Sequence, residues 1–183
     1  MTKPSDGRLL IKLARESISS YFLQKEPDIS IVKQFSDKQG VFVTLYKNKQ
    51  LRGCIGFPEP VFPLFEAIIK SARSAAFEDP RFPPLQKEEL KHIKIEISVL
   101  TVPVLIEVKK SDDYLKKIKI GKDGLIVRSS LGSGLLLPQV ATEYNWDVKE
   151  FLGHLCEKAW LKQDAWKDIN NQIYKFQAQI FKE

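Results

Sequence analysis

A short segment in the first third of the chain combines a thiol with a guanidinium. Residues 51–56 read Leu-Arg-Gly-Cys-Ile-Gly, so Cys54 lies two residues after Arg52. If the segment is a strand, side chains two residues apart share a face, and these two are neighbours. Leu51 and Ile55 then point to the opposite, core side. Because a guanidinium beside a thiol favours the nucleophilic thiolate, the hexamer predicts that Cys54 has a lowered pKa and serves as a nucleophile, redox thiol or substrate contact.

The two glycines of this segment support a binding site as well as a catalytic one. Gly53 and Gly56 have no Cβ, so another backbone or a ligand can approach closely. We therefore take Gly53 as a candidate ligand-binding position, with Arg52 contacting an anionic group. The alternative is that Cys54 is a small buried apolar residue, as free cysteines usually are. The residues alone leave both interpretations open.

A second candidate is the loop at residues 79–82, which reads Asp-Pro-Arg-Phe. Pro80 fixes its own backbone and restricts Asp79, so the loop is expected to be rigid. Such a loop suits Arg81 as an anion-binding fork that Asp79 orients. The alternative is a structural ion pair between Asp79 and Arg81 that anchors the loop. The functional interpretation predicts that Arg81 converges on one cleft with Arg52 and Cys54.

A thiol-dependent reaction also needs a general base. Glu96 and Ser98 share the polar face of the alternating segment 93–99, and Glu96 could act as the base if that face continues the one bearing Cys54. A solvated strand face is the alternative for these residues. His154 is the other candidate base, because the chain has only two histidines.

The sequence predicts no metal centre and no cofactor. His154 and Cys156 look like a ligand pair, but positions i and i+2 of a helix lie about 200° apart and cannot hold one ion. Cys156 borders an apolar helical stripe and is expected in the core. The glycine-rich segments 121–124 and 132–134 lack the spacing of phosphate-binding loops.

Charge and composition narrow the class of partner. The net charge is +6, from 29 basic and 23 acidic residues, but the lysines interleave with acidic residues through most of the chain. This pattern is typical of a solvated surface rather than a nucleic-acid footprint. There is no signal-like segment and no apolar run near the ~20 residues that span a bilayer, so a cytoplasmic protein without a membrane partner is expected. Two distant cysteines predict no disulfide framework.

Apolar periodicity indicates the elements that must position these residues. Helical stripes cover residues 6–25, 63–77 and 147–158, and Asp147 with Glu150 forms a plausible capping box at the start of the last one. The strands are predicted at residues 40–46, 51–56, 93–99, 118–120, 125–127, 131–135 and 174–180. Two hairpins are expected, over residues 40–56 and 118–127. Strands with isolated helices and no βαβ rhythm predict an α+β fold. We expect one domain over residues 1–183, with an antiparallel sheet flanked mainly on one side by helices and a smaller lobe at residues 104–137.

Five segments in order resemble one known family. These are the hexamer at 51–56, Ser-Ala-Ala-Phe-Glu-Asp-Pro-Arg-Phe at 74–82, the strand at 90–100 that ends in Ile-Ser-Val-Leu, Leu-Pro-Gln-Val at 137–140, and residues 151–159. Together they resemble the AMMECR domain family over nearly the whole chain. One departure is that the family usually continues Lys-Ala-Gly-Leu, whereas Lys158 and Ala159 are followed here by Trp160. That glycine is typical of a helix C-terminus.

The resemblance implies a compact α+β domain with no settled reaction. It also implies an association with Memo-type and radical-SAM proteins, the AmmeMemoRadiSam context of the family. Two function classes follow from the residues. The first is an accessory or binding module whose Arg52, Gly53, Asp79 and Arg81 recognise an anionic ligand or partner. The second is a thiol-dependent enzyme with Cys54 as nucleophile.

Overall fold

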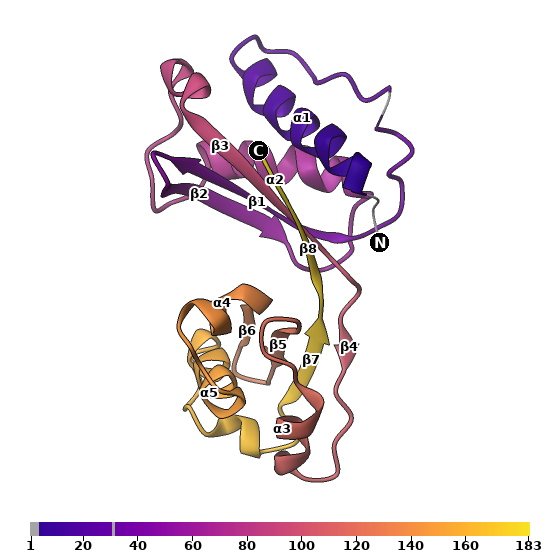
Figure 1. Ribbon diagram of the computed structural model, residues 1–183, viewed down its shortest axis with the longest axis vertical. Helices are drawn as coiled ribbons and strands as arrows, with labels where there is room; N and C mark the ends of the chain where they lie inside the picture. The colour runs from indigo at the N-terminus through magenta and orange to yellow at the C-terminus, as the bar shows by residue number, and fades with distance from the viewer. Residues whose placement is uncertain (1–3, 31) are drawn as a thin grey trace. The chain divides into compact units, whose positions relative to one another are not determined.

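The computed structural model describes residues 4–30 and 32–183, and the chain divides into two compact units (Figure 1). The first unit comprises residues up to 102 together with residues 179–183, and the second comprises residues 103–178. The α+β class is confirmed, but each unit has its own four-stranded sheet instead of the single sheet expected. The lobe expected at residues 104–137 begins near this boundary and extends to residue 178.

The first unit is built on a sheet with the strand order β2-β1-β3-β8. Its elements are α1 (Pro4–Tyr21), β1 (Gly40–Lys47), β2 (Gln50–Phe57), α2 (Leu64–Phe77), a 3-10 turn (Lys87–Lys91), β3 (Ile93–Leu100) and β8 (Ala178–Lys182). β1 pairs antiparallel with both β2 and β3. Asn48 and Lys49 form the tight turn of the expected hairpin, with φ values of 52° and 64°.

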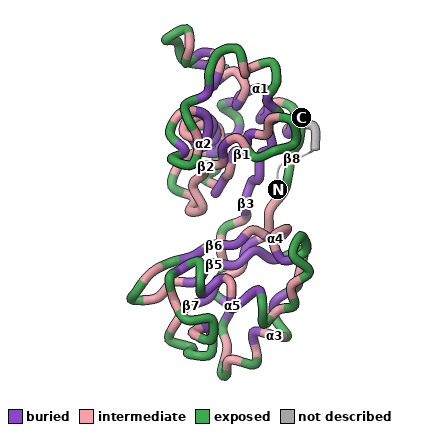
Figure 2. The backbone as a smooth tube through the Cα atoms, turned by 90° about the vertical axis from the view of Figure 1, so that its left-hand side faces the viewer, coloured by how far each residue is buried: buried purple, intermediate pink, exposed green. Residues whose placement is uncertain are grey.

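Both helices pack on one face of this sheet. The helix α2 contacts β1 and β2, and α1 contacts β3. Alternate residues such as Val43, Leu45 and Ile97 fill the core between the sheet and the helices. Figure 2 shows the buried stretches of the backbone in purple. Because side chains alternate along a strand, the intervening residues point to the opposite face. Leu51 was expected in this core, but it follows the turn directly at the start of the outer strand β2 and is exposed.

The second unit has the strand order β4-β7-β5-β6. Its elements are β4 (Val104–Leu105), a 3-10 turn (Ser111–Asp113), α3 (Tyr114–Lys117), β5 (Gly124–Arg128), β6 (Ser133–Leu136), α4 (Pro138–Glu143), α5 (Val148–Lys158), a 3-10 turn (Ala165–Lys167) and β7 (Gln172–Phe176). Its core gathers around Phe151, Leu152 and Ile173, which are fully buried. No helix within the described residues has the length and apolar character needed to cross a membrane.

Two predicted strand arrangements were wrong. The hairpin over residues 118–127 does not form, because the buried Asp123 carboxylate accepts the Lys119 N–H at 2.9 Å and folds residues 119–123 into a turn. β5 pairs instead with β6 and β7. The predicted last strand at 174–180 is two strands, since β7 belongs to the second sheet and β8 to the first.

The two ends of α5 show how local sequence fixes a helix. The predicted capping box is present: Asp147 accepts the Glu150 N–H at 2.9 Å, and Glu150 accepts the Asp147 N–H at 2.8 Å. At the other end the Trp160 and Leu161 N–H groups close a Schellman motif on the last carbonyls of the helix. Trp160 therefore takes the left-handed conformation that favours glycine, with φ of 60°, while 96% of its surface is exposed.

Candidate functional site

A polar row crosses the first sheet on the face opposite the helices. Thr44 of β1 lies directly opposite Cys54 of β2 and Glu96 of β3, so the three side chains share one face. The Thr44 hydroxyl lies 3.2 Å from the Cys54 Sγ. Lys182 of β8 extends the row, because its Nζ lies 2.8 Å from a Glu96 carboxylate oxygen. The sheet thus aligns a thiol, a hydroxyl, a carboxylate and an ammonium group.

The ion pair between Glu96 and Lys182 compensates for the burial of the Glu96 carboxylate. Thr44 and Glu96 are buried, whereas Lys182 is exposed. A buried carboxylate needs a charged or hydrogen-bonding partner, and Lys182 supplies it from β8, the last strand of the chain. The conditional prediction that Glu96 shares the face of Cys54 is confirmed by the strand register. Its role as a base stays a prediction.

The Asp79 loop closes the outer edge of β2 at Cys54. The Cys54 N–H donates to an Asp79 carboxylate oxygen at 2.8 Å, and the Arg81 guanidinium donates to the Cys54 carbonyl at 3.1 Å. Both backbone groups would otherwise face outward, because β2 is the end strand of its sheet. A carboxylate and a guanidinium therefore replace the hydrogen bonds of a neighbouring strand at this point.

Asp79 and Arg81 also bind each other. The Arg81 Nε and Nη2 atoms donate to the two Asp79 carboxylate oxygens at 2.9 and 2.7 Å, and the Arg81 backbone N–H donates at 3.1 Å. These bonds from Arg81, together with that from the Cys54 N–H, hold the pKa of Asp79 at about 2. The expected ion pair is present, and Arg81 lies against the backbone of Cys54. Its side chain remains 54% exposed.

Arg52 is bound elsewhere. Its Nε and Nη2 atoms donate to the Glu89 carboxylate at 3.1 and 2.9 Å, and Glu89 also accepts from the Lys47 ammonium and the Gln86 N–H. The bonds from Arg52 are the main reason that the pKa of Glu89 falls to about 2. The Arg52 guanidinium, expected at the thiol, therefore belongs to a structural ion-pair network with Glu89.

The prediction that Arg52 lowers the pKa of Cys54 was wrong. Burial raises the pKa of the Cys54 thiol above its ordinary value, and the opposing influences are the hydrogen bond with Thr44 and the positive charge of Arg81. The negative charges of Asp79 and Glu96 raise the pKa further. Cys54 is thus protonated at neutral pH, because burial has the largest effect on its pKa and the nearby positive and negative charges act in opposite directions.

Gly53 faces the helix layer. A Cβ built on Gly53 would lie 2.1 Å from the Ala75 carbonyl oxygen, so the backbone of α2 occupies the space that a ligand was expected to use. The glycine is required because the helix packs directly on the strand. Cys54, one residue later, points to the other face, and only that face carries the polar row.

His154 belongs to the second unit, whereas Cys54 belongs to the first. The His154 ring stacks on Trp146 with centroids 3.9 Å apart, and its Nδ1 lies 2.7 Å from a Glu157 carboxylate oxygen. Cys156 is fully buried, as predicted, and burial raises its pKa to about 11. Among the described residues, no group of three or more His, Cys, Asp or Glu side chains is arranged to hold a metal ion.

Sequence reasoning missed three members of these clusters. Thr44 could have been found from the alternation of residues 40–46, which places it on the polar face of its strand. Glu89 and Lys182 have no local signal, because each meets its partner only after the strands are aligned.

Comparisons with known proteins agree with this architecture. The chain is 50% identical to protein MJ0810 of Methanocaldococcus jannaschii, covering 97% of this chain and 90% of the relative. It is 49% identical to protein PF1979 of Pyrococcus furiosus, with coverage of 97% and 88%. The crystal structure of an uncharacterised protein, PH0010 of Pyrococcus horikoshii, matches with a TM-score of 0.91 and 46% identity over 99% of this chain and 93% of that one.

The family comparison covers both units. The AMMECR1 family model matches residues 11–181, which include the hexamer, the Asp79 loop and nearly all of β8. The resemblance inferred from the motifs is therefore confirmed over nearly the whole chain. The chain belongs to the AMMECR1 family.

Proposed function

We propose that this protein is a binding module that recognises an anionic group with the exposed guanidinium of Arg81, beside Cys54. The observation that carries the proposal is the fixed orientation of Arg81. Its Nε and Nη2 atoms are bonded to Asp79 and the Cys54 carbonyl, whereas Nη1 makes no hydrogen bond with any described residue. The two N–H groups on Nη1 are available to a carboxylate or phosphate.

Preorganisation is the physical advantage of this arrangement. An arginine normally loses rotamer freedom when it binds, but the contacts with Asp79 have already restricted this side chain. The charge of Asp79 balances that of Arg81, so hydrogen-bond geometry rather than net charge provides most of the selectivity. This favours small oxyanions, such as a carboxylate or a phosphate, with an oxygen that accepts an N–H of Nη1.

The environment of the thiol argues against the alternative, a thiol-dependent enzyme. Burial keeps Cys54 protonated at neutral pH, and the hydrogen-bonding partner of its sulfur is the Thr44 hydroxyl. Glu96, the candidate base, is paired with Lys182. A nucleophilic cysteine needs a base within hydrogen-bond reach or a lowered pKa, and among the described residues Cys54 has neither.

Family context suggests the kind of molecule that carries the anion. We propose that it is an acidic segment of a Memo-type or radical-SAM protein, which the AMMECR context associates with this family. In this view the protein is an accessory factor, and Arg81 docks a carboxylate of its partner.

The test is an NMR titration of the amide signals of Cys54 and Arg81 with phosphate and with acetate. We expect saturable shifts in the wild-type protein, about tenfold weaker binding in Arg81→Gln, and partial binding in Arg81→Lys, which keeps the charge without the fork. Lys122→Gln removes one charge from the second unit and should leave the affinity unchanged. Equal affinity in Arg81→Gln and wild type would contradict the proposal.

Cys54→Ser separates the two function classes. The serine keeps the shape of the row and the backbone that Arg81 binds, so we expect its anion affinity to stay within about twofold of wild type. If Cys54→Ser abolishes binding while Arg81→Gln preserves it, the thiol is the functional group and the enzyme alternative is favoured.

A further inference from the structure

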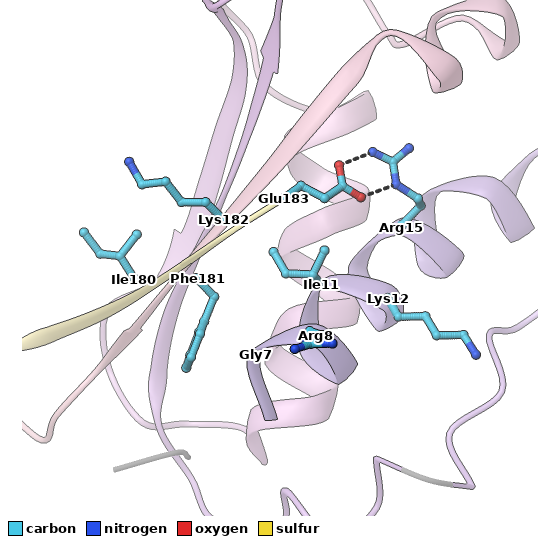
Figure 3. Close-up of a pocket in the computed structure, with 9 residues that line it drawn as sticks. All are labelled: Gly7, Arg8, Ile11, Lys12, Arg15, Ile180, Phe181, Lys182 and Glu183. Carbon is cyan, nitrogen blue, oxygen red and sulfur yellow. Dashed lines mark hydrogen bonds and ion pairs between the residues drawn. The ribbon is translucent and has the colours of Figure 1, made fainter. Parts of the chain in front are cut away.

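The two outer strands of the first sheet, β2 and β8, differ in what lies along their outer edges. At β2 the Asp79 loop occupies the edge, and its carboxylate and guanidinium bind the Cys54 backbone. At the other end of the sheet, β8 is the outer strand, and an open groove of about 540 Å³ runs between β8 and α1 (Figure 3). The groove lies entirely within the first unit. Its lining includes Arg8, Lys12 and Arg15 of α1 and residues 180–183.

An ion pair lies at one end of the groove. There the Arg15 guanidinium binds the Glu183 carboxylate and the carbonyls of Leu90 and Ile93. Figure 3 shows Phe181 and Glu183 pointing toward α1, and Ile180 and Lys182 pointing away from it. The helix lies this close to β8 because Gly7 has no Cβ. A Cβ at that position would be 2.2 Å from the Phe181 ring.

The backbone of β8 offers hydrogen bonds along this groove. The Glu183 N–H donates to the Ile95 carbonyl of β3 at 3.1 Å, so residue 183 bonds inward. Because backbone groups alternate along a strand, residue 180 directs its N–H and C=O to the outer edge. An extended chain lying beside β8 could pair with Ile180 and become a fifth strand.

The helix wall of the groove is positively charged. Arg8, Lys12 and Arg15 recur at i, i+4 and i+7, so they follow one side of α1. Arg15 is bound to Glu183, but Arg8 is exposed and forms no hydrogen bond or ion pair with any described residue. Lys12 is also exposed, and its charge acts on Asp28 without a hydrogen bond between them. Arg8 and Lys12 therefore provide positive charge that an acidic partner could bind.

We infer that this groove binds an extended acidic segment of another protein by β-strand addition to β8. Backbone pairing at Ile180 provides affinity, and alternate side chains of the added strand provide specificity. Side chains directed toward α1 meet Arg8, which favours Glu or Asp at those positions. Side chains directed to the opposite face lie beside Ile180 and Lys182, which favours apolar residues flanked by acidic ones.

The test uses a capped peptide of alternating Glu and Val, seven residues long, with binding followed by NMR of the full chain. We expect saturable shifts at Ile180 and at residues 8–12. A second peptide of the same sequence with N-methylated central residues should bind about tenfold more weakly, because it keeps every charge but cannot pair with the strand. A third peptide with Lys in place of Glu should bind weakly as well.

Two substitutions at one position isolate the backbone hydrogen bond. Ile180→Pro removes an outward N–H, which an edge strand tolerates, and should reduce the affinity about tenfold. Ile180→Ala shortens the side chain but keeps the N–H and should stay within about threefold of wild type. Arg8→Gln should weaken binding about fivefold, whereas Lys122→Gln in the second unit should not.

Several results would overturn the inference. Equal binding of the N-methylated peptide, or equal affinity in Ile180→Pro and Ile180→Ala, would exclude strand addition. Self-association of the protein that Ile180→Pro abolishes would assign the edge to a second copy of the chain instead. Arg81→Gln should leave peptide binding unchanged, so failure of this proposal is distinguishable from failure of the anion site at Arg81.

Discussion

Replacing Asp79 by asparagine should destabilise the first unit in a pH-dependent way. At neutral pH the carboxylate accepts the Cys54 N–H and three N–H groups of Arg81. The side chain of Asp79 is only 1% exposed, so water cannot replace these bonds. Asparagine has the same shape but one acceptor oxygen, and its NH2 group must face a donor. We expect Asp79→Asn to cost about 3 kcal/mol at pH 7.

The pH dependence follows from the depressed pKa. The folded-state pKa of Asp79 is about 2, against an ordinary value of 3.8. The stabilisation is therefore fully present above about pH 4 and is lost as the pH falls toward 2. A shift of nearly two pKa units corresponds to about 2 kcal/mol of unfolding free energy. The difference between wild type and Asp79→Asn should thus shrink from about 3 to about 1 kcal/mol by pH 2.

The assay is urea denaturation of the wild type and the variant from pH 7 to pH 2, with the methyl NMR signals of Val43 and Ile97 reporting the first unit. All three tryptophans lie in the second unit, so their fluorescence gives a reference transition in the same sample. Glu78→Gln is the matched control, because it removes an exposed neighbouring carboxylate and should change the stability by less than about 0.5 kcal/mol.

One result would refute this reasoning directly. If Asp79→Asn destabilises the first unit equally at pH 7 and pH 2, the charge of the carboxylate contributes nothing, and Asp79 acts only through its shape. A loss at pH 7 as small as that of Glu78→Gln would likewise show that the loop does not hold the edge of β2.

Three further outcomes are expected. Trp160→Gly should raise the unfolding free energy of the second unit by about 1 kcal/mol, because it relieves a left-handed backbone and loses no burial; an unchanged thermal midpoint would contradict this. Gly53→Ala should cost more than about 2 kcal/mol in a thermal melt of the first unit, because its Cβ would overlap the Ala75 carbonyl. Alkylation followed by peptide mapping should modify Cys54 before Cys156, with little reaction at neutral pH and a rate that rises as the pH is raised; reaction at Cys156 first would reverse the assignment.

Local patterns predicted most elements of the fold correctly. The capping box at Asp147 opens α5, the turn at Asn48 and Lys49 joins β1 to β2, and the alternation of residues 93–99 forms β3. These features depend on residues within one turn or one strand, where side-chain periodicity and backbone preference act directly. The predicted strand at 174–180 failed because the same alternation fits two strands in two sheets, and the period alone does not place the break at Gln177.

The side-chain alternation placed Cys54 and Glu96 on one face of the sheet but did not identify their partners. The alternation of side chains along β2 and β3 is sufficient to place Cys54 and Glu96 on polar faces, and the register aligns those faces. Whether the guanidinium of Arg52 reached the thiol depended on Glu89, which lies 37 residues away and captures it. An ion pair goes to the opposite charge that offers the best geometry, and that geometry exists only after the chain has folded.

The amino-acid sequence by itself thus determined the family, the α+β class and the face on which the thiol lies, because these follow from periodicity and local motifs. The tertiary structure decided how far that thiol is buried and in which direction its pKa shifts. Cys54 is half-buried, and this burial raises the pKa of its thiol; the charges of Asp79 and Glu96 act in the same direction and that of Arg81 in the opposite one. Burial and charge balance are sums over groups from distant segments, so no window of the sequence contains them.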